Sequence, residues 1–170
     1  MLVRALLQAG LDTTINSLAA AVHALALFPQ EFAKLRENPS LAKSAFDEAI
    51  RFESPVQTFF RTATRAATLG GVPVQEGDKV LMFLGAANRD PRRWPEPDRY
   101  DISLRQSGHV GFGAGIHACV GQLIAKMEGE LILTSLARRA KSIELAGAPR
   151  RHYNNTIRSW ATLPISIVAA

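Results

Sequence analysis

The order of apolar and polar residues predicts that helices lead the chain. Residues 2–27 are rich in Ala and Leu and apolar almost all round, which predicts one long helix that is buried on every side. Pro29 starts a second, shorter helix and Pro39 ends it. A third helix is predicted from about Ser40 to the residue before Ser54, because the proline after Ser54 disfavours helical backbone there.

The pattern changes after Ser54 to short runs of β-type residues separated by glycine-rich turns. These runs are 56–65, 67–74 and 79–85. Residues 88–108 show little periodicity and hold three prolines, and an irregular stretch of that length is usually functional or fixed to the scaffold. A helix is predicted over about 120–140 and short strands over 143–168. The expected fold is therefore α+β, mainly helical with small β-sheets.

The composition is typical of a globular protein, with 47% hydrophobic and 21% charged residues among 170. The net charge of +5 comes from scattered basic residues without interleaved aromatic residues, so we expect no nucleic-acid partner. The longest apolar run, residues 17–28, is too short to span a bilayer, and no signal peptide is visible. One cysteine excludes an internal disulfide framework. We therefore expect a cytoplasmic protein that does not attach to a membrane.

The single cysteine lies in a glycine-rich segment, GFGAGIHACVG, residues 111–121. Glycines permit sharp or left-handed turns and a close approach to a flat ligand. Cys119 precedes a predicted helix, whose free N–H groups and dipole favour a thiolate that could be a nucleophile or a metal ligand. His117, two residues away, is poorly placed to serve as the base of a nucleophile. A cysteine buried for packing is the alternative, but packing does not require this glycine spacing.

Two predicted helices carry further candidates. In AGLDTT, residues 9–14, a mid-helix glycine costs about 1 kcal/mol relative to alanine, and the Thr13 hydroxyl can bond to the Ala9 carbonyl. A notch for helix packing is the simpler interpretation of that segment. In EAIR, Glu48 and Arg51 share a helix face and can pair. Taken alone, such a pair is usually solvent-exposed and contributes little.

These segments, in this order and spacing, resemble motifs of the cytochrome P-450 family, the haem-thiolate monooxygenases: the haem-binding signature, the oxygen-activation groove and Glu-x-x-Arg. The resemblance runs from residue 1 to 170. It implies haem b as cofactor, with Cys119 as the axial thiolate ligand of the iron. It also implies insertion of one oxygen atom of O2 into a small organic substrate, with electrons from a ferredoxin-type donor.

The resemblance also assigns roles on both sides of the haem. Ala9 and Gly10 would leave room for dioxygen, and Asp12 and Thr13 match the acid–alcohol pair that relays protons to it. His117 and Arg61 would bind the two haem propionates, with a strand-surface arginine as the alternative for Arg61. The ligand loop would be shaped by Phe112, Gly113 and Gly121.

Three more positions match a structural triad that supports the fold rather than the chemistry. They are Glu48, Arg51 and Arg99, the last within Pro-Asp-Arg-Tyr, residues 97–100.

The stretches 51–65, 83–94 and 107–123 are most similar to bacterial members that oxidise para-substituted benzoic acids. By that resemblance Val56 and Phe59 would line the substrate pocket. Ile157 is a weaker match, for which a place in the core of a sheet is an equal alternative. Nearby, Arg158 and Ser159 stand where the family usually has Arg-Gly, a departure that can alter the pocket loop.

Family members are more than twice this long. We therefore expect residues 1–170 to be the C-terminal, haem-binding part of one domain, truncated inside the oxygen-groove helix. The sequence leaves three functions open: part of a monooxygenase, a non-catalytic fragment that binds haem weakly or not at all, and a small haem-thiolate protein for redox or sensing.

Overall fold

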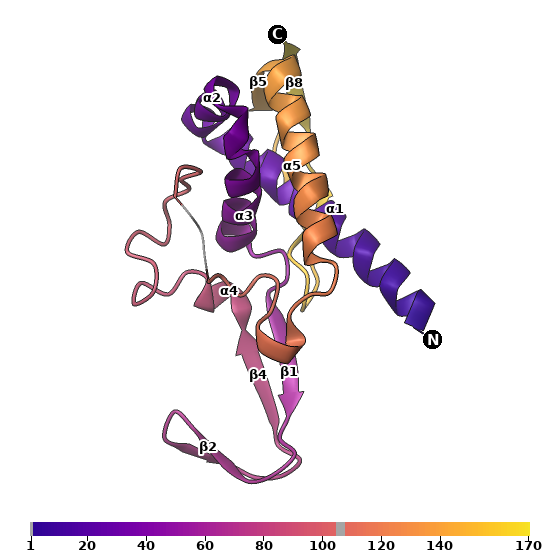
Figure 1. Cartoon of the computed structure of the whole chain (residues 1–170), viewed down its shortest axis with the longest axis vertical. Helices are drawn as coiled ribbons and strands as arrows, with labels where there is room; N and C mark the ends of the chain where they lie inside the picture. Colours follow the sequence, from indigo (N-terminus) through magenta and orange to yellow (C-terminus); the bar gives the residue numbers. More distant parts are fainter. Residues whose placement is uncertain (1, 105–107) are drawn as a thin grey trace.

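The fold is seen in a computed structural model that describes residues 2–104 and 108–170 (Figure 1). The helices are α1 (Leu2–Leu27), α2 (Pro29–Glu37), the 3-10 turn η1 (Pro39–Leu41), α3 (Ala42–Glu53), α4 (Leu84–Ala87), the 3-10 turn η2 (Gly115–His117) and α5 (Gln122–Arg139). The strands are β1 (Thr58–Thr62), β2 (Ala67–Leu69), β3 (Val72–Val74), β4 (Lys79–Phe83), β5 (Ala140–Leu145), β6 (Arg150–His152), β7 (Ser159–Thr162) and β8 (Ile165–Ala169). The mainly helical fold with small sheets is the one that the sequence predicts.

The core forms where α3 packs against both α1 and α5 (Figure 1). Phe46, on α3, and Leu133, on α5, are fully buried there. Beside them the rings of Phe28, Phe52 and Tyr100 meet with centroids 5.5 to 5.6 Å apart. Burial of these large apolar side chains is the main source of stability and holds α3 between α1 and α5.

Burial of α1 is confined to its second half, which corrects the expectation of a helix buried on every side. Ala21, Ala24 and Leu25 have no exposed surface, whereas Val3 and Leu7 are 70% and 71% exposed. Figure 1 shows the N-terminal turns of α1 extending away from the other elements. The apolar pattern of these turns is therefore not matched by packing within the described part of the chain.

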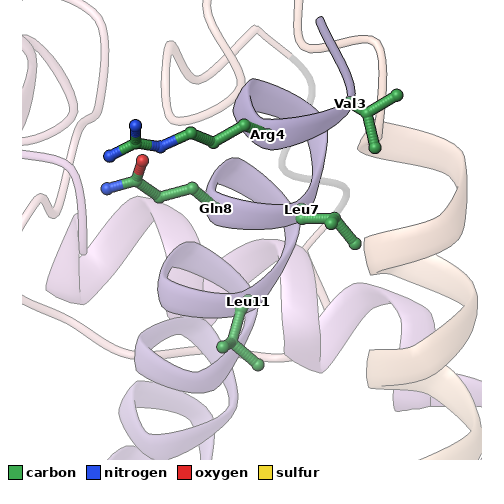
Figure 2. A pocket seen from close by; sticks show the side chains of 5 residues that line it. All are labelled: Val3, Arg4, Leu7, Gln8 and Leu11. Carbon is green, nitrogen blue, oxygen red and sulfur yellow. The ribbon is translucent and has the colours of Figure 1, made fainter. Parts of the chain in front are cut away.

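A shallow hollow lies along the same N-terminal turns. Figure 2 shows Val3, Leu7 and Leu11 along one side of the helix and Arg4 and Gln8 along another. In residues 2–104 and 108–170, no single helix is long and apolar enough to cross a membrane. Only the bent pair formed by Leu7–Leu27 and α2 meets that length and composition together.

The strands that the structure describes pair as four two-stranded antiparallel sheets. β1 pairs with β4, from Thr58 opposite Phe83 to Thr62 opposite Lys79, and this ribbon extends away from the helices with β2 at its far end (Figure 1). β2 pairs with β3, β5 with β8, and β6 with β7. An isolated bridge joins Val56 to Ile157, so the chain just before β1 lies beside the chain just before β7.

Candidate functional site

A cavity of about 660 Å³ lies between α1, the start of β1 and the glycine-rich loop. Its volume falls within the roughly 300–1,000 Å³ that is usual for small-molecule and cofactor sites. Eleven of the predicted haem, oxygen and substrate residues line it: Ala9, Gly10, Thr13, Val56, Phe59, Arg61, Phe112, Gly113, His117, Cys119 and Gly121. The fold thus brings together segments that are far apart in the sequence.

The loop that carries Cys119 is closed by backbone hydrogen bonds. The Cys119 amide donates to the Phe112 carbonyl at 2.8 Å, and the Gly113 amide donates to the Val110 carbonyl at 2.9 Å. Gly113 has φ +71°, and a Cβ there would lie 2.5 Å from the His117 carbonyl oxygen. No side chain is compatible with that contact. Both the positive φ and the lack of space for a Cβ therefore require glycine at position 113, as the sequence predicts.

Gly111 is required for a different reason, because the loop passes directly over α3. A Cβ on Gly111 would lie 2.3 Å from the Ile50 Cγ2 atom. Cys119 itself is exposed and lies just before the first residue of α5, Gln122, whose amide donates to the Cys119 carbonyl at 3.3 Å.

On the other wall of the cavity, α1 presents an open notch. The Thr13 hydroxyl donates to the Ala9 carbonyl at 2.7 Å, which confirms the predicted bond. Nothing lies within 4 Å of where a Gly10 Cβ would be, so the helix surface is bare at that point. Asp12 is exposed and is not among the cavity-lining residues, whereas Thr14 and Ser17 are. Neither Thr14 nor Ser17 was predicted, although Ser17 lies one turn after Thr13.

The predicted substrate residues approach from β1 and the segment before it. Val56 and Phe59 line the cavity, while Ile157 is paired with Val56 by the backbone bridge and is not itself among the lining residues. Arg61 also lines the cavity, and its guanidinium carbon lies 6.0 Å from the centroid of the Phe59 ring. The guanidinium donates to the Phe60 carbonyl at 2.9 Å. Arg61 is thus a cation on the cavity wall, beside an aromatic ring.

Glu48 and Arg51 form a buried pair beneath the site. Arg51 donates to both carboxylate oxygens of Glu48, at 2.7 and 2.8 Å, and the two side chains are 2% and 0% exposed. Arg99 joins the pair through its carbonyl, which accepts from Arg51 at 2.9 Å. Its own side chain is half exposed and pairs with Glu96 and Asp101. The triad residues are adjacent, but Arg99 acts here through its main chain.

A charged cluster supports Phe112 from behind. Lys126 on α5 lies 2.9 Å from the Asp47 carboxylate, and its Nζ atom is 5.2 Å from the centroid of the Phe112 ring. His109 approaches the same carboxylate at 3.7 Å and accepts from the Gly111 amide at 3.2 Å. Burial alone would raise the pKa of Asp47, but the nearby side chains of His109 and Lys126 lower it below its ordinary value. The Asp47 carboxylate therefore stays ionised and holds Lys126 and His109 beside the start of the loop.

Asn88 is a connecting residue that the sequence did not point to. Its side chain donates to the Ser54 hydroxyl at 2.9 Å and accepts from the Val110 amide at 2.8 Å. Its carbonyl accepts from Arg51 at 3.0 Å. Asn88 thus links the buried pair to the loop of Cys119. A lone asparagine at the start of an irregular stretch carries no periodic signal that could have identified it.

The described residues fit a haem group. Haem b is flat and apolar with two carboxylates, and its iron takes a soft axial ligand such as a thiolate. The cavity offers one exposed cysteine on a loop whose glycines allow close approach, and Arg61 and His117 as partners for carboxylates. The bare helix surface at Gly10 leaves space on the opposite wall.

Comparison with known proteins gives matches along the whole chain. The family model described as Cytochrome P-450 matches residues 1–142. Cytochrome P-450 CYP199A2 of Rhodopseudomonas palustris is 63% identical over 170 residues, which is 100% of this chain and 41% of that protein.

Two solved structures are similar to this chain, each with a TM-score of 0.90. The first, CYP108D1 from Novosphingobium aromaticivorans, is 39% identical, and the match covers 95% of this chain and 39% of the CYP108D1 chain. The second is a cytochrome P-450, BioI, in complex with an acyl carrier protein ligated to hexadec-9Z-enoic acid. It is 36% identical, and the match covers 94% of this chain and 42% of the BioI chain. The chain thus spans about two fifths of the length of these relatives.

Proposed function

The chain belongs to the cytochrome P-450 family, and on that premise we propose that residues 1–170 are the C-terminal, haem-binding part of a haem-thiolate monooxygenase domain. The observation that carries the proposal is the shared cavity. One wall holds Cys119 on its glycine-rich loop, and the other holds Gly10 and Thr13 on α1. A cysteine that faces a bare, hydroxyl-bearing helix surface across the cavity suits oxygen activation at a haem iron held between them.

Haem b, when bound, supplies an iron centre that activates dioxygen for transfer of one oxygen atom to the substrate. Cys119 would hold the iron through its sulfur. Phe112 would lie against the ligand loop, on the Cys119 side of the haem. Arg61 and His117 would bind the two propionates, because charge-assisted hydrogen bonds to carboxylates are the strongest that side chains make.

Proton delivery is assigned to Thr13 and Asp12. The Thr13 hydroxyl donates to the Ala9 carbonyl, so its oxygen can accept a further hydrogen bond from the cavity. When the hydroxyl turns away from Ala9 it can donate a proton into the cavity instead. Asp12 is adjacent and exposed to solvent, which suits a carboxylate that takes up protons and passes them to Thr13.

The substrate that we propose is a small aromatic acid oxidised at the group para to its carboxylate. This proposal is supported by the resemblance of the stretches around Val56 and Phe59 to bacterial members with that activity. Both side chains line the cavity, and apolar side chains of this kind suit a flat ring. We propose a ferredoxin-type protein as the electron donor and the cytoplasm as the location, as the resemblance to bacterial members of the family implies.

The alternative is that this 170-residue chain is a non-catalytic fragment. It is supported by the exposure of Val3 and Leu7 on α1, which leaves the N-terminal turns of this helix without packing partners among the described residues. A third possibility is a small haem-thiolate protein for redox or sensing.

A labelling experiment distinguishes the three functions. The chain is loaded with haem, supplied with electrons by a ferredoxin, and given isotopically labelled dioxygen and para-methylbenzoate, whose hydroxylation keeps the inserted oxygen in the product. One labelled atom in the product and the other in water supports the monooxygenase. A thiolate-type haem spectrum without labelled product supports the redox or sensing protein and contradicts our proposal. No haem binding supports the non-catalytic fragment.

A further inference from the structure

A buried carboxylate at the end of α3, outside the predicted site, gathers three cationic or ionisable side chains. Glu53 is 4% exposed. One of its oxygens pairs with His23 on α1 at 3.2 Å. The other pairs with Arg151 on β6 at 2.7 Å and with Arg158, just before β7, at 3.2 Å. Both oxygens are therefore occupied, and each contact ties α3 to a different segment.

The rings of the same cluster close it on one side. The Arg151 guanidinium lies 3.2 Å from the centroid of the Trp160 ring, and the His23 ring lies 4.3 Å from the same ring. The Trp160 Nε1 atom is buried without a hydrogen-bond partner among the described residues. The orientation of Trp160 therefore depends on its packing against Arg151 and His23, both of which Glu53 holds.

Directly beside this cluster, a seam of main-chain bonds joins residues 155–158 to residues 55–58. The Arg158 amide donates to the Pro55 carbonyl and the Gln57 amide donates to the Thr156 carbonyl, each at 2.8 Å. Val56 lies between these two bonds, bridged to Ile157. Val56 and Pro55 also line the cavity. The position of this part of the cavity wall is thus set by the seam.

Glu53 supplies the negative charge that holds the outer side of the seam in place. Within residues 2–104 and 108–170, it is the one carboxylate paired with Arg151 and with Arg158. Loss of its charge would leave two arginines and His23 around a neutral side chain, and like charges gathered in a partly buried place repel one another. Arg158 is 42% exposed and can turn to solvent, which would pull on the chain between Thr156 and Ser159.

We propose that Glu53 is a positioning residue for the substrate-facing wall: by holding Arg151 and Arg158 it keeps the segment 155–158 against Pro55 and Val56, and so sets the width of the cavity at Val56. This inference rests on the proposed function in one respect, because it takes the cavity to be the place where substrate binds. The link from Glu53 to the seam does not depend on haem.

The first test needs no haem and measures hydrogen exchange in the chain itself. Glu53→Gln should speed exchange of the Gln57 and Arg158 amides by about tenfold, since local opening of the seam becomes easier. The amide of Asn38, in the turn after α2, should not change. Glu76→Gln removes the same charge from an exposed turn and serves as the matched control. Unchanged exchange at Gln57 and Arg158 would overturn the proposal.

A second variant covers the case in which Glu53→Gln does not fold. Arg158→Gln removes one arm of the cluster from a partly exposed position and should speed exchange at the same two amides. Glu53→Asp keeps the charge on a shorter side chain and should restore part of the protection. Fast exchange in Glu53→Asp equal to that in Glu53→Gln would mean that the charge is not what holds the seam, and would reject the inference.

In the ligand-binding experiment, the haem-loaded chain is titrated with para-methoxybenzoate. The change in the haem spin state measures binding. Glu53→Gln should weaken binding by about tenfold while leaving the spectrum of the reduced carbon-monoxide complex unchanged. Faster exchange with unchanged ligand affinity would reduce Glu53 to a structural residue and overturn its positioning role. If the parent chain takes up no haem, the proposed function fails, while the exchange experiment still decides whether Glu53 holds the seam.

Discussion

Arg51 holds both carboxylate oxygens of Glu48 at 2.7 and 2.8 Å, and neither side chain is more than 2% exposed. Burial raises the pKa of the Glu48 carboxyl above its ordinary value, even though Arg51 lies beside it. Burial of the pair therefore costs free energy, and removal of one partner costs far more because it leaves an unpaired buried charge. Its role is to fix α3, from which Ile50 supports the loop of Cys119.

Removal of one partner of this pair should unfold much of the chain. Arg51→Ala leaves an unpaired buried carboxylate and should lower the free energy of unfolding by roughly 3–5 kcal/mol. Urea denaturation followed by circular dichroism measures the loss. Arg99→Ala is the matched control, because that side chain is 54% exposed and its carbonyl remains to accept from Arg51. Equal destabilisation by both variants would contradict the structural picture.

Gly113 and Gly115 provide a matched pair within the cysteine loop. Both have positive φ, but a Cβ on Gly113 would lie 2.5 Å from the His117 carbonyl, while one on Gly115 meets nothing within 4 Å. Gly115→Ala should cost only the backbone strain of about 1–2 kcal/mol. Gly113→Ala should cost more and should weaken haem binding, which absorbance titration measures. Tighter haem binding by Gly113→Ala than by Gly115→Ala would show that the loop does not hold the observed turn.

Thr13 and Asp12 should control how oxygen is used. Thr13→Ala removes the hydroxyl and Asp12→Asn the carboxylate, so protons should reach the wrong oxygen atom and peroxide should replace product. The measurement is product formed per reductant consumed, with peroxide assayed in parallel, in the haem-loaded protein. Thr68→Ala, on the exposed strand β2, is the control. The same yield in Thr13→Ala and in the parent would remove Thr13 from the mechanism.

The Glu53 cluster should make stability depend on pH in the acid range. Burial alone would raise the pKa of Glu53, but the hydrogen bond with His23 and the charges of Arg158 and Arg151 lower it from 4.5 to about 2. A lowered folded-state pKa gives stability that is complete above the unfolded-state pKa and is lost as the pH falls through the folded-state value.

The corresponding experiment compares the parent with Glu53→Gln by urea unfolding between about pH 6 and pH 2. The parent's advantage from ionisation should be about 3 kcal/mol near pH 6 and should shrink steadily below about pH 4.5. Groups that do not interact with Glu53 cancel in the difference. An advantage that stays constant down to pH 2 would show that the carboxylate is not held ionised by its neighbours.

The secondary structure was predictable because its signals are local. The prolines at 29 and 39 bound α2, and the residues before Pro55 end α3 where expected. The four-residue helix α4 has no such signal and was missed. The exposure of Val3 and Leu7 was also missed, because an apolar pattern shows that a face suits burial but not which segment covers it.

The site was predictable where a short motif carries its own geometry. The loop around Cys119 and the bond from Thr13 to Ala9 depend on residues within one or two turns of each other. Asn88 and Glu53 could not be found in this way, because their partners lie far along the chain and each is a single polar residue without a spacing pattern. Likewise, the family resemblance groups Arg99 with Arg51 but does not say that its carbonyl, rather than its guanidinium, makes the contact.

The role of Cys119 is tested most directly by the absorption spectrum of the reduced carbon-monoxide complex after the chain is loaded with haem. The parent should absorb at the wavelength typical of thiolate-ligated haem. Cys119→Ser should lose that band, whereas Ala118→Ser, which places the same hydroxyl one residue earlier and keeps the thiol, should retain it. A thiolate-type spectrum that persists in Cys119→Ser would contradict the assignment of Cys119 as the iron ligand.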